Sequence, residues 1–93
     1  MTVDVRDNPD RSRYEIFVDE AMVGIADYVV RSDSIVFPHT VIDPAMRGQG
    51  LAAQLVQVAL DDARRAGRTV VPQCWYVAQF IDEHPQYRDL LAA

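Results

Sequence analysis

The sequence predicts a mixed α/β (α+β) fold, in which an antiparallel meander of strands is followed by a helical crossover to a parallel strand and a C-terminal helix. Up to residue 43, short segments rich in strand-forming residues alternate with brief polar turns, a spacing typical of antiparallel strands. From residue 44 onward, a helical pattern, a short apolar segment and a second helical pattern follow one another. A helix between two strands delivers the second strand parallel to its neighbour.

The N-terminal part of the chain contains the strands of the meander. Tyr14, Ile16 and Val18 are spaced two apart and therefore face the same side of a strand. The polar segment 6–13 contains Asn-Pro and is predicted to form a turn. Pro38 lacks a backbone N–H, so its strand should be distorted or unpaired at that residue. The expected strands are residues 2–5, 13–19, 22–30 and 35–43.

The C-terminal part reads as helix, strand and helix. Apolar residues cover one wide stripe of segment 51–66, which predicts an amphipathic helix, and Gly67 is a natural stop. Residues 69–74 are predicted to form a short buried strand. Residues 75–84 follow as a second helix, closed by Pro85.

Composition favours a single domain over residues 1–93 with one modest hydrophobic core. The formal net charge of −5 argues against nucleic acid as a partner, because phosphate binding needs a positive surface. An acidic surface would suit an amine substrate, and it would equally serve solubility alone. No apolar run approaches the roughly 20 residues of a membrane span, and no signal peptide is recognised. The single cysteine fits a reducing compartment, so a cytoplasmic location is expected.

The segment MRGQGLA (46–52) connects an expected strand to an expected helix. Gly48 and Gly50 leave backbone N–H groups uncovered at the positive end of the helix dipole, a geometry that binds phosphate. The same glycines could equally do no more than permit a tight turn. The segment lacks the Gly-Lys-Ser/Thr of a Walker loop, and Ala53 stands where the dinucleotide fingerprint requires its third glycine.

In its context VIDPAMRGQGLA (41–52), this loop resembles the acetyl-CoA pyrophosphate loop of the GNAT acetyltransferases, whose pattern is Arg/Gln-x-x-Gly-x-Gly/Ala. Arg47, Gly50 and Ala52 fill the three defined positions, after a Val-x-x-Pro lead-in. The resemblance implies that backbone amides of the loop hold the pyrophosphate of acetyl-CoA and that the strand before it hydrogen-bonds the pantetheine. The implied cofactor-binding residues are Val41, Ile42, Arg47, Gly48, Gln49, Gly50, Leu51, Ala52, Cys74 and Tyr76.

Two further features resemble the compact, single-domain branch of that superfamily. One is His39-Thr40 before the loop, and the other is the ending CWYVAQFIDEHPQYRDLL (74–91). The resemblance therefore extends over about residues 13–91. It also implies that the strand from residue 69 diverges from its parallel neighbour and that the thioester lies in the wedge between them.

Cys74 is the first candidate for chemistry. It precedes a helix, whose N-terminus favours a thiolate, although a cysteine in this position could equally be buried and inert. The resemblance implies that it either accepts the acetyl group or donates a proton to the departing CoA thiolate. Many larger GNAT enzymes use a tyrosine on the last helix for that proton, and compact relatives often have a tyrosine where this chain has Phe80. Tyr76 lies one helical turn earlier and could replace it, or it could be packing.

His39 is the second candidate. On simple alternation it shares a strand face with Ile35, Phe37 and Val41, where a lone histidine is commonly a hydrogen-bonded core residue. Its place just before the cofactor loop makes it a candidate base through the resemblance. His84, beside Pro85, is read as a C-terminal helix cap.

The sequence thus predicts an acetyl-CoA-dependent N-acetyltransferase acting on a primary amine, which could be a small amine, a peptide N-terminus or a lysine side chain. No metal site is expected. The resemblance implies an acceptor site that is open or completed by a partner protein. The alternatives are a non-catalytic acyl-CoA-binding module and a structural domain in which the glycines only form a turn.

Overall fold

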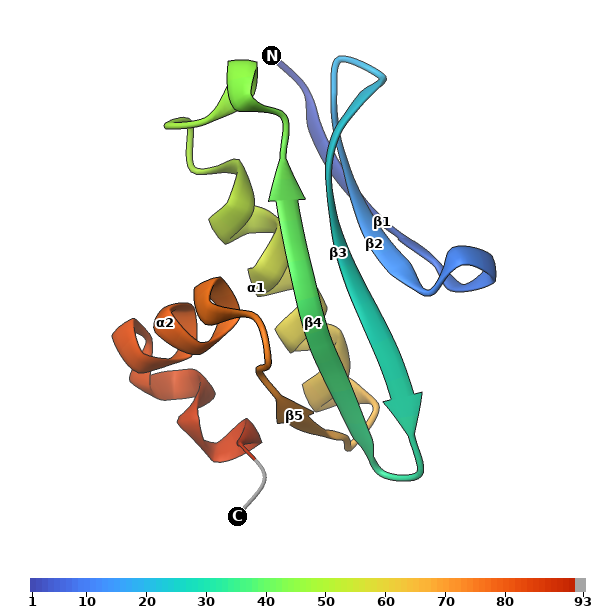
Figure 1. The fold of residues 1–93 in the computed structure, drawn as a ribbon, viewed down its shortest axis with the longest axis vertical. Coiled ribbons are helices and arrows are strands. Elements are labelled where there is room, and N and C mark those ends of the chain that lie inside the picture. The colour runs from blue at the N-terminus through green and yellow to red at the C-terminus, as the bar shows by residue number, and fades with distance from the viewer. Residues whose placement is uncertain (92–93) are drawn as a thin grey trace.

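The computed structural model describes residues 1–91 and confirms the predicted α+β class. One five-stranded sheet has the order β1-β2-β3-β4-β5, with antiparallel pairing through β4 and a parallel pairing of β4 with β5. Figure 1 shows the sheet with the two main helices beside it. The strands are β1 (Val3–Asn8), β2 (Arg13–Val18), β3 (Ala21–Arg31), β4 (Ser34–Ile42) and β5 (Thr69–Val71).

The helices follow the predicted pattern. The two α-helices end one residue before their predicted limits, at Arg65 and Glu83. Short 3-10 helices flank the strands and helices. The helical elements are η1 (Pro9–Arg11), η2 (Pro44–Met46), α1 (Leu51–Arg65), α2 (Trp75–Glu83) and η3 (Pro85–Leu90).

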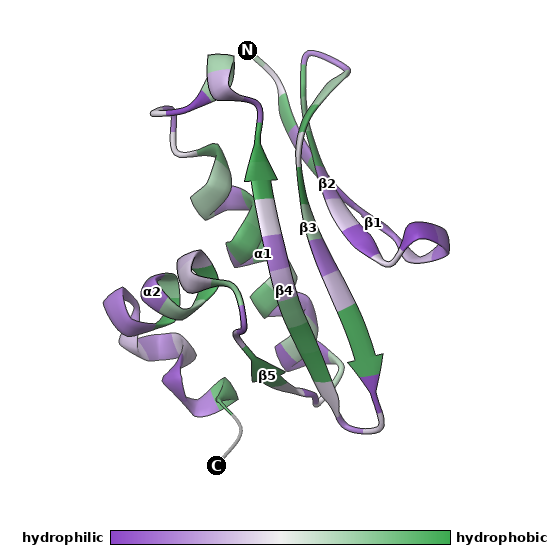
Figure 2. Ribbon diagram, in the orientation of Figure 1, coloured by the Kyte–Doolittle hydropathy of each residue, from purple (hydrophilic) through white to green (hydrophobic). Residues whose placement is uncertain are grey.

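A single hydrophobic core lies between one face of the sheet and the helices. Tyr14, Ile16 and Val18 are all buried in it, as their alternation predicts. They pack with the apolar stripe of α1, which includes Leu55 and Leu60, both completely buried. The hydropathy colours of Figure 2 show this arrangement, with hydrophobic stretches of α1 beside the sheet. None of the helices within residues 1–91 has the length and apolar character to cross a membrane.

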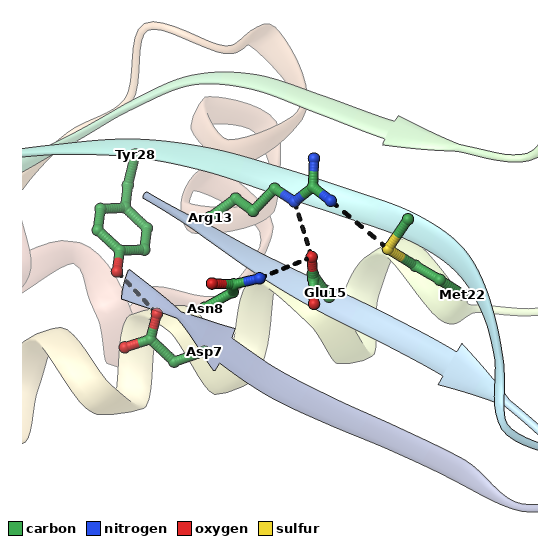
Figure 3. A network of polar contacts seen from close by, with 6 residues as sticks. All are labelled: Asp7, Asn8, Arg13, Glu15, Met22 and Tyr28. Atoms are coloured by element: carbon green, nitrogen blue, oxygen red, sulfur yellow. Dashed lines mark hydrogen bonds and ion pairs between the residues drawn. The ribbon is translucent and has the colours of Figure 1, made fainter. Parts of the chain in front are cut away.

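Two predicted boundaries were wrong. The turn expected at 6–13 is shorter, because β1 continues to Asn8 and pairs with β2 along its whole length. Polar side chains link the end of β1 to β2 (Figure 3). Arg13 donates to the Glu15 carboxylate at 2.8 Å, and Asn8 donates to the same oxygen at 3.2 Å. The strand expected over 69–74 ends at Val71, because Pro72 has no backbone N–H to extend the ladder.

The distortion predicted at Pro38 is a β-bulge. Val29 pairs with Val36 and Asp27 pairs with His39, so the single residue between them on β3 faces both Phe37 and Pro38 on β4. The extra residue reverses the alternation of side chains beyond it. The second half of β4 therefore presents a different set of residues to the helices than simple alternation predicts.

Candidate functional site

The loop between β4 and α1 is built by two glycines in the left-handed region. Gly48 has a φ of 83° and Gly50 a φ of 73°, and a Cβ placed on either would meet no atom of residues 1–91 within 4 Å. Gly50 is the N-cap of α1, so the helix begins without a capping side chain from the described part of the chain. The first amides of α1 have no partner within the helix and are available to an anion.

A cavity of about 230 Å³ adjoins this loop. Arg47, which is exposed, supplies its positive charge. The cavity is lined by Ile42, Met46, Arg47, Gly48, Gly50, Leu51, Ala52, Ala53 and Tyr76. Backbone amides, a glycine-rich turn and one guanidinium form a donor set that fits a diphosphate.

A second cavity, of about 460 Å³, continues from the first. The two share Ile42, Arg47, Ala52 and Tyr76. The second cavity adds Thr40, Val41 and Trp75. Together the cavities form a groove that runs from the glycine loop, along the end of β4, to the first turn of α2.

Cys74 lies beside the inner end of this groove. It is the N-cap of α2, and its sulfur lies 3.5 Å from the hydroxyl oxygen of Thr40. Its backbone N–H donates to the carbonyl of Phe37 at 2.8 Å, which holds the start of α2 against β4 just where β5 has ended. β5 pairs with β4 over Thr69–Val71, and the Cys74 amide makes a further backbone bond to β4.

The surroundings of Cys74 favour the thiolate. Burial alone would raise the pKa of the thiol, but the Thr40 hydroxyl and the backbone amides of Val77 and Tyr76 outweigh burial, so the pKa lies below its usual value. The two amides face the sulfur without making a capping hydrogen bond to it. A sulfur in this environment is suited to nucleophilic attack or to proton donation.

Tyr76 and Phe80 occupy different surroundings although they lie on one face of α2. Tyr76 is half-buried and lines both cavities, and burial, followed by the negative charge of Glu83, raises the pKa of its phenol. It is therefore a neutral proton donor at neutral pH. Phe80 is buried and stacks on the ring of His84, with ring centroids 4.0 Å apart.

His84 has the predicted position. It is the C-cap of α2, and its Nδ1 lies 2.7 Å from the carbonyl oxygen of Phe80. The imidazole thereby binds one of the carbonyls that a helix leaves without a partner at its end.

The placement predicted for His39 was wrong. Thr40 pairs with the buried Ala26 and faces the helices, whereas His39 pairs with Asp27 and points to the opposite side of the sheet. His39 is exposed, and it shares this side with Val41 but with neither Ile35 nor Phe37. The bulge at Pro38 is the cause. Thr40 therefore lines the groove and contacts Cys74 behind it, while His39 lies on the other face of the same strand.

Most of the predicted cofactor residues line the groove. Gln49, whose side chain is exposed and contacts Met46, and Cys74, which is buried behind Thr40, are not part of its lining within residues 1–91. Thr40, Met46, Ala53 and Trp75 line it without having been assigned to the cofactor. The position of Thr40 could have been predicted from Pro38, because a bulge at that proline turns Thr40 toward the helices.

The chain is similar to known proteins in sequence and in fold. A family model described as GCN5-related N-acetyl-transferase matches residues 13–90. Protein NATD1 of Bos taurus is 36% identical over 55 residues, a match that covers 57% of this chain and 49% of that protein. Protein NATD1 of Xenopus tropicalis is 28% identical over 95 residues, covering 94% of this chain and 85% of that protein.

Solved structures share the fold. A GCN5-like putative N-acetyltransferase from Staphylococcus aureus superposes with a TM-score of 0.74 at 16% identity, over 97% of this chain and 88% of that one. An N-acetylglutamate synthase from Neisseria gonorrhoeae, solved with coenzyme A and N-acetyl-glutamate, superposes with a TM-score of 0.64 at 14% identity, over 84% of this chain and 22% of that one.

Proposed function

The chain belongs to the GCN5-related N-acetyltransferase family, and on this premise we propose that it transfers an acetyl group from acetyl-CoA to a primary amine. One observation carries the proposal. A continuous groove leads from the glycine loop at the N-terminus of α1 to Thr40, whose hydroxyl contacts a thiol with a lowered pKa at the N-terminus of α2. The two ends suit the two chemically distinct ends of an acyl-CoA.

The donor would be held mainly by the backbone. Amides from Arg47 to Ala52 would bind the pyrophosphate, the Arg47 guanidinium would neutralise part of its charge, and the end of β4 at Val41 and Ile42 would hydrogen-bond the pantetheine. Gln49 and Leu51 belong to the same loop and contribute amides. Acetyl-CoA supplies the acetyl thioester, and the protein supplies position and proton transfer.

Two routes for the acetyl group fit the position of Cys74. In the first, the amine nitrogen forms a bond to the carbonyl carbon, the C–S bond breaks, and a proton reaches the departing sulfur from Cys74 or Tyr76. In the second, the Cys74 thiolate displaces the CoA thiolate, and the amine then attacks the acetyl-cysteine. In both routes His39 would accept the proton that the amine loses, from the other face of β4.

A non-catalytic acyl-CoA-binding module is the second candidate. It is favoured by one observation, namely that His39 and Cys74 lie on opposite faces of β4. A second observation also favours it: Phe80 is packed on His84, at the position where compact relatives are expected to carry a tyrosine as proton donor.

The proposal includes three classes of amine acceptor. We take residues 1–93 as one acetyltransferase domain with an acceptor site that is open, or completed by a partner protein, and that receives a small amine, a peptide N-terminus or a lysine side chain. The exposed indole of Trp75, which is 74% accessible at the edge of the groove, is consistent with an open site.

Two measurements test the proposal. Acetyl-CoA at a hundredfold excess over its dissociation constant should stabilise the fold by about 2.7 kcal/mol, measured as a rise in the melting temperature. Steady-state release of CoA with a panel of primary amines then separates an enzyme from a binding module. A melting curve that does not respond to acetyl-CoA would contradict both candidates.

A further inference from the structure

Asp27 is a charged residue in the middle of the sheet, and no side chain of residues 1–91 pairs with its carboxylate. Aspartate is disfavoured within strands, and β3 is flanked by a strand on each side. Its side chain is half-buried on the sheet face turned away from α1, which we term the open face. Among residues 1–91, its carboxylate forms neither a hydrogen bond nor an ion pair with another side chain.

The nearest cation on the neighbouring strand is already engaged. Arg13 pairs with Asp27 across β2 and β3, but its Nε donates to Glu15 at 2.8 Å and its guanidinium reaches toward the sulfur of Met22 at 3.9 Å. Figure 3 shows the Arg13 side chain directed to these two groups. The charge of Arg13 is therefore shared with Glu15, which Asn8 also contacts.

On its other side, Asp27 stands directly opposite His39 in the register of β3 and β4. Side chains directly opposite in an antiparallel pair have Cβ atoms about 4.5–5.5 Å apart, within reach of a carboxylate and an imidazole. The pair exists only because of the bulge at Pro38, which turns His39 to the open face.

The open face also reaches the groove. Val41 lies two residues after His39, points to the same side and lines the second cavity together with Trp75. Residues two apart on a strand are separated by about 6.6 Å, so the imidazole is close to the mouth of the groove on this side. An acceptor amine arriving over the open face would meet His39 before it meets the core.

From this register and from the unpaired Asp27 carboxylate we infer that Asp27 is a positioning residue for His39 and that the acceptor amine approaches over the open face of the sheet. This inference rests on the proposed function. The amine nitrogen gives a proton to one imidazole nitrogen of His39 while its electron pair forms the C–N bond, and the C–S bond of the thioester breaks with its electron pair leaving on the sulfur. The Asp27 carboxylate accepts a hydrogen bond from the other imidazole nitrogen, which fixes the tautomer and the orientation of the ring.

A double-mutant cycle tests this assignment. Asp27→Asn should lower kcat about 10-fold or more with an unchanged KM for acetyl-CoA, as expected when a ring is held in the wrong tautomer. In a His39→Asn background the same substitution should have no further effect, because the two residues act as one unit. Asp27→Glu should recover part of the activity. Independent, multiplying losses would overturn the inference, as would an equal loss in Asp33→Asn, a control in the β3–β4 turn.

A second measurement does not depend on turnover. Nitrogen chemical shifts of the imidazole rings report the tautomer of each histidine, and the chain has only His39 and His84. Asp27→Asn should change the tautomer ratio of His39 and leave that of His84, which contacts the Phe80 carbonyl, as it was. An unchanged His39 ratio would overturn the inference. Failure of acetyl-CoA to raise the melting temperature would instead contradict the proposed function, so the two outcomes are distinguishable.

Discussion

The sulfur of Cys74 and the hydroxyl oxygen of Thr40 lie 3.5 Å apart, and this contact joins the N-cap residue of α2 to the second half of β4. It stands at the point where β5 has ended and the Cys74 amide donates to the Phe37 carbonyl of β4. At the inner end of the groove, the Thr40 hydroxyl lines the cavity and the Cys74 thiol lies behind it against the core, so the chemistry of this end depends on both groups.

Thr40 is predicted to support the Cys74 thiolate. Thr40→Val removes a donor to the sulfur, and hydrogen bonds to charged groups are worth about 1.5–3 kcal/mol, so the pKa of Cys74 should rise and its thiolate fraction at neutral pH should fall about 10-fold or more. The ultraviolet absorbance of the thiolate, followed against pH, measures this. Thr40→Ser keeps the hydroxyl and should titrate like the parent; a Val variant that does so too would contradict the prediction.

The glycine loop offers a matched pair of substitutions. Gly50 and Gly67 have φ values of 73° and 71°, and each has open space around its Cβ position. Alanine at either position should cost about 1 kcal/mol of folding free energy. Only Gly50→Ala should reduce the melting-temperature rise caused by acetyl-CoA, because Gly67 lies at the far end of α1. Equal responses to acetyl-CoA in the two variants would exclude the loop as the pyrophosphate site.

The sequence predicted the fold well because its signals are local. Alternation of Tyr14, Ile16 and Val18, the stripe of α1 and the stop at Gly67 each depend on residues close together in the chain. The boundaries at Asn8 and Val71 were less predictable. They depend on pairing with β2 and β4, which are partners that a local pattern does not reveal.

The part of the candidate site that is formed by the backbone of one loop was predictable from the sequence. Arg47, Gly48 and Gly50 lie together in one turn, so their cavity followed from a contiguous motif. The faces of His39 and Thr40 did not follow, because a bulge reverses the alternation and its position depends on how Pro38 is accommodated opposite β3. A proline within a strand signals such a reversal but does not fix its register.

His39→Asn should separate a catalytic role from a structural one. His39 is exposed, so the variant should fold with nearly the stability of the parent, within about 0.5 kcal/mol. If His39 is the base, kcat should fall about 100-fold with little change in the affinity for acetyl-CoA. Steady-state CoA release as a function of acetyl-CoA concentration measures the turnover, and the rise in melting temperature with acetyl-CoA measures the affinity. Unaltered turnover would leave His39 without a catalytic role.

Tyr28 links the middle of the sheet to its edge and should contribute to stability in a pH-dependent way. Its hydroxyl donates to Asp7 at 2.7 Å, and burial, followed by this hydrogen bond and the charge of Asp7, raises the pKa of Tyr28 to about 12 (Figure 3). Because the pKa of Tyr28 is higher in the folded than in the unfolded state, the protonated phenol stabilises the fold fully at pH values below the unfolded pKa of about 10. This contribution is lost as the pH rises through the folded pKa.

Tyr28→Phe removes this contribution. The variant should lose about 1 kcal/mol at neutral pH, because the hydrogen bond is removed, and its stability should fall less than that of the parent between about pH 10 and pH 12. Denaturant unfolding across this range measures the difference. The same alkaline loss in both proteins would show that Tyr28 does not titrate differently in the folded state.

Cys74 decides between the two routes for the acetyl group. Transfer from CoA to a cysteine exchanges one thioester for another, so the step is nearly balanced in free energy and its rate depends on available thiolate. If Cys74 accepts the group, acetyl-CoA without amine should add one acetyl group to the protein, removable by hydroxylamine at neutral pH and visible by mass spectrometry. Cys74→Ala should lose this adduct and most of the turnover.

The serine variant distinguishes the acetyl-cysteine route from direct attack by the amine. Cys74→Ser keeps a small polar side chain beside Thr40, but its hydroxyl is a far weaker nucleophile at neutral pH, so it should bind acetyl-CoA without forming the adduct at a comparable rate. If Cys74→Ala instead retains acetyl-CoA binding and near-normal transfer, the amine attacks directly and Cys74 is packing. The proton for the departing thiolate must then come from another group, and Tyr76, whose raised pKa keeps it protonated at the wall of the groove, is the residue to substitute by phenylalanine.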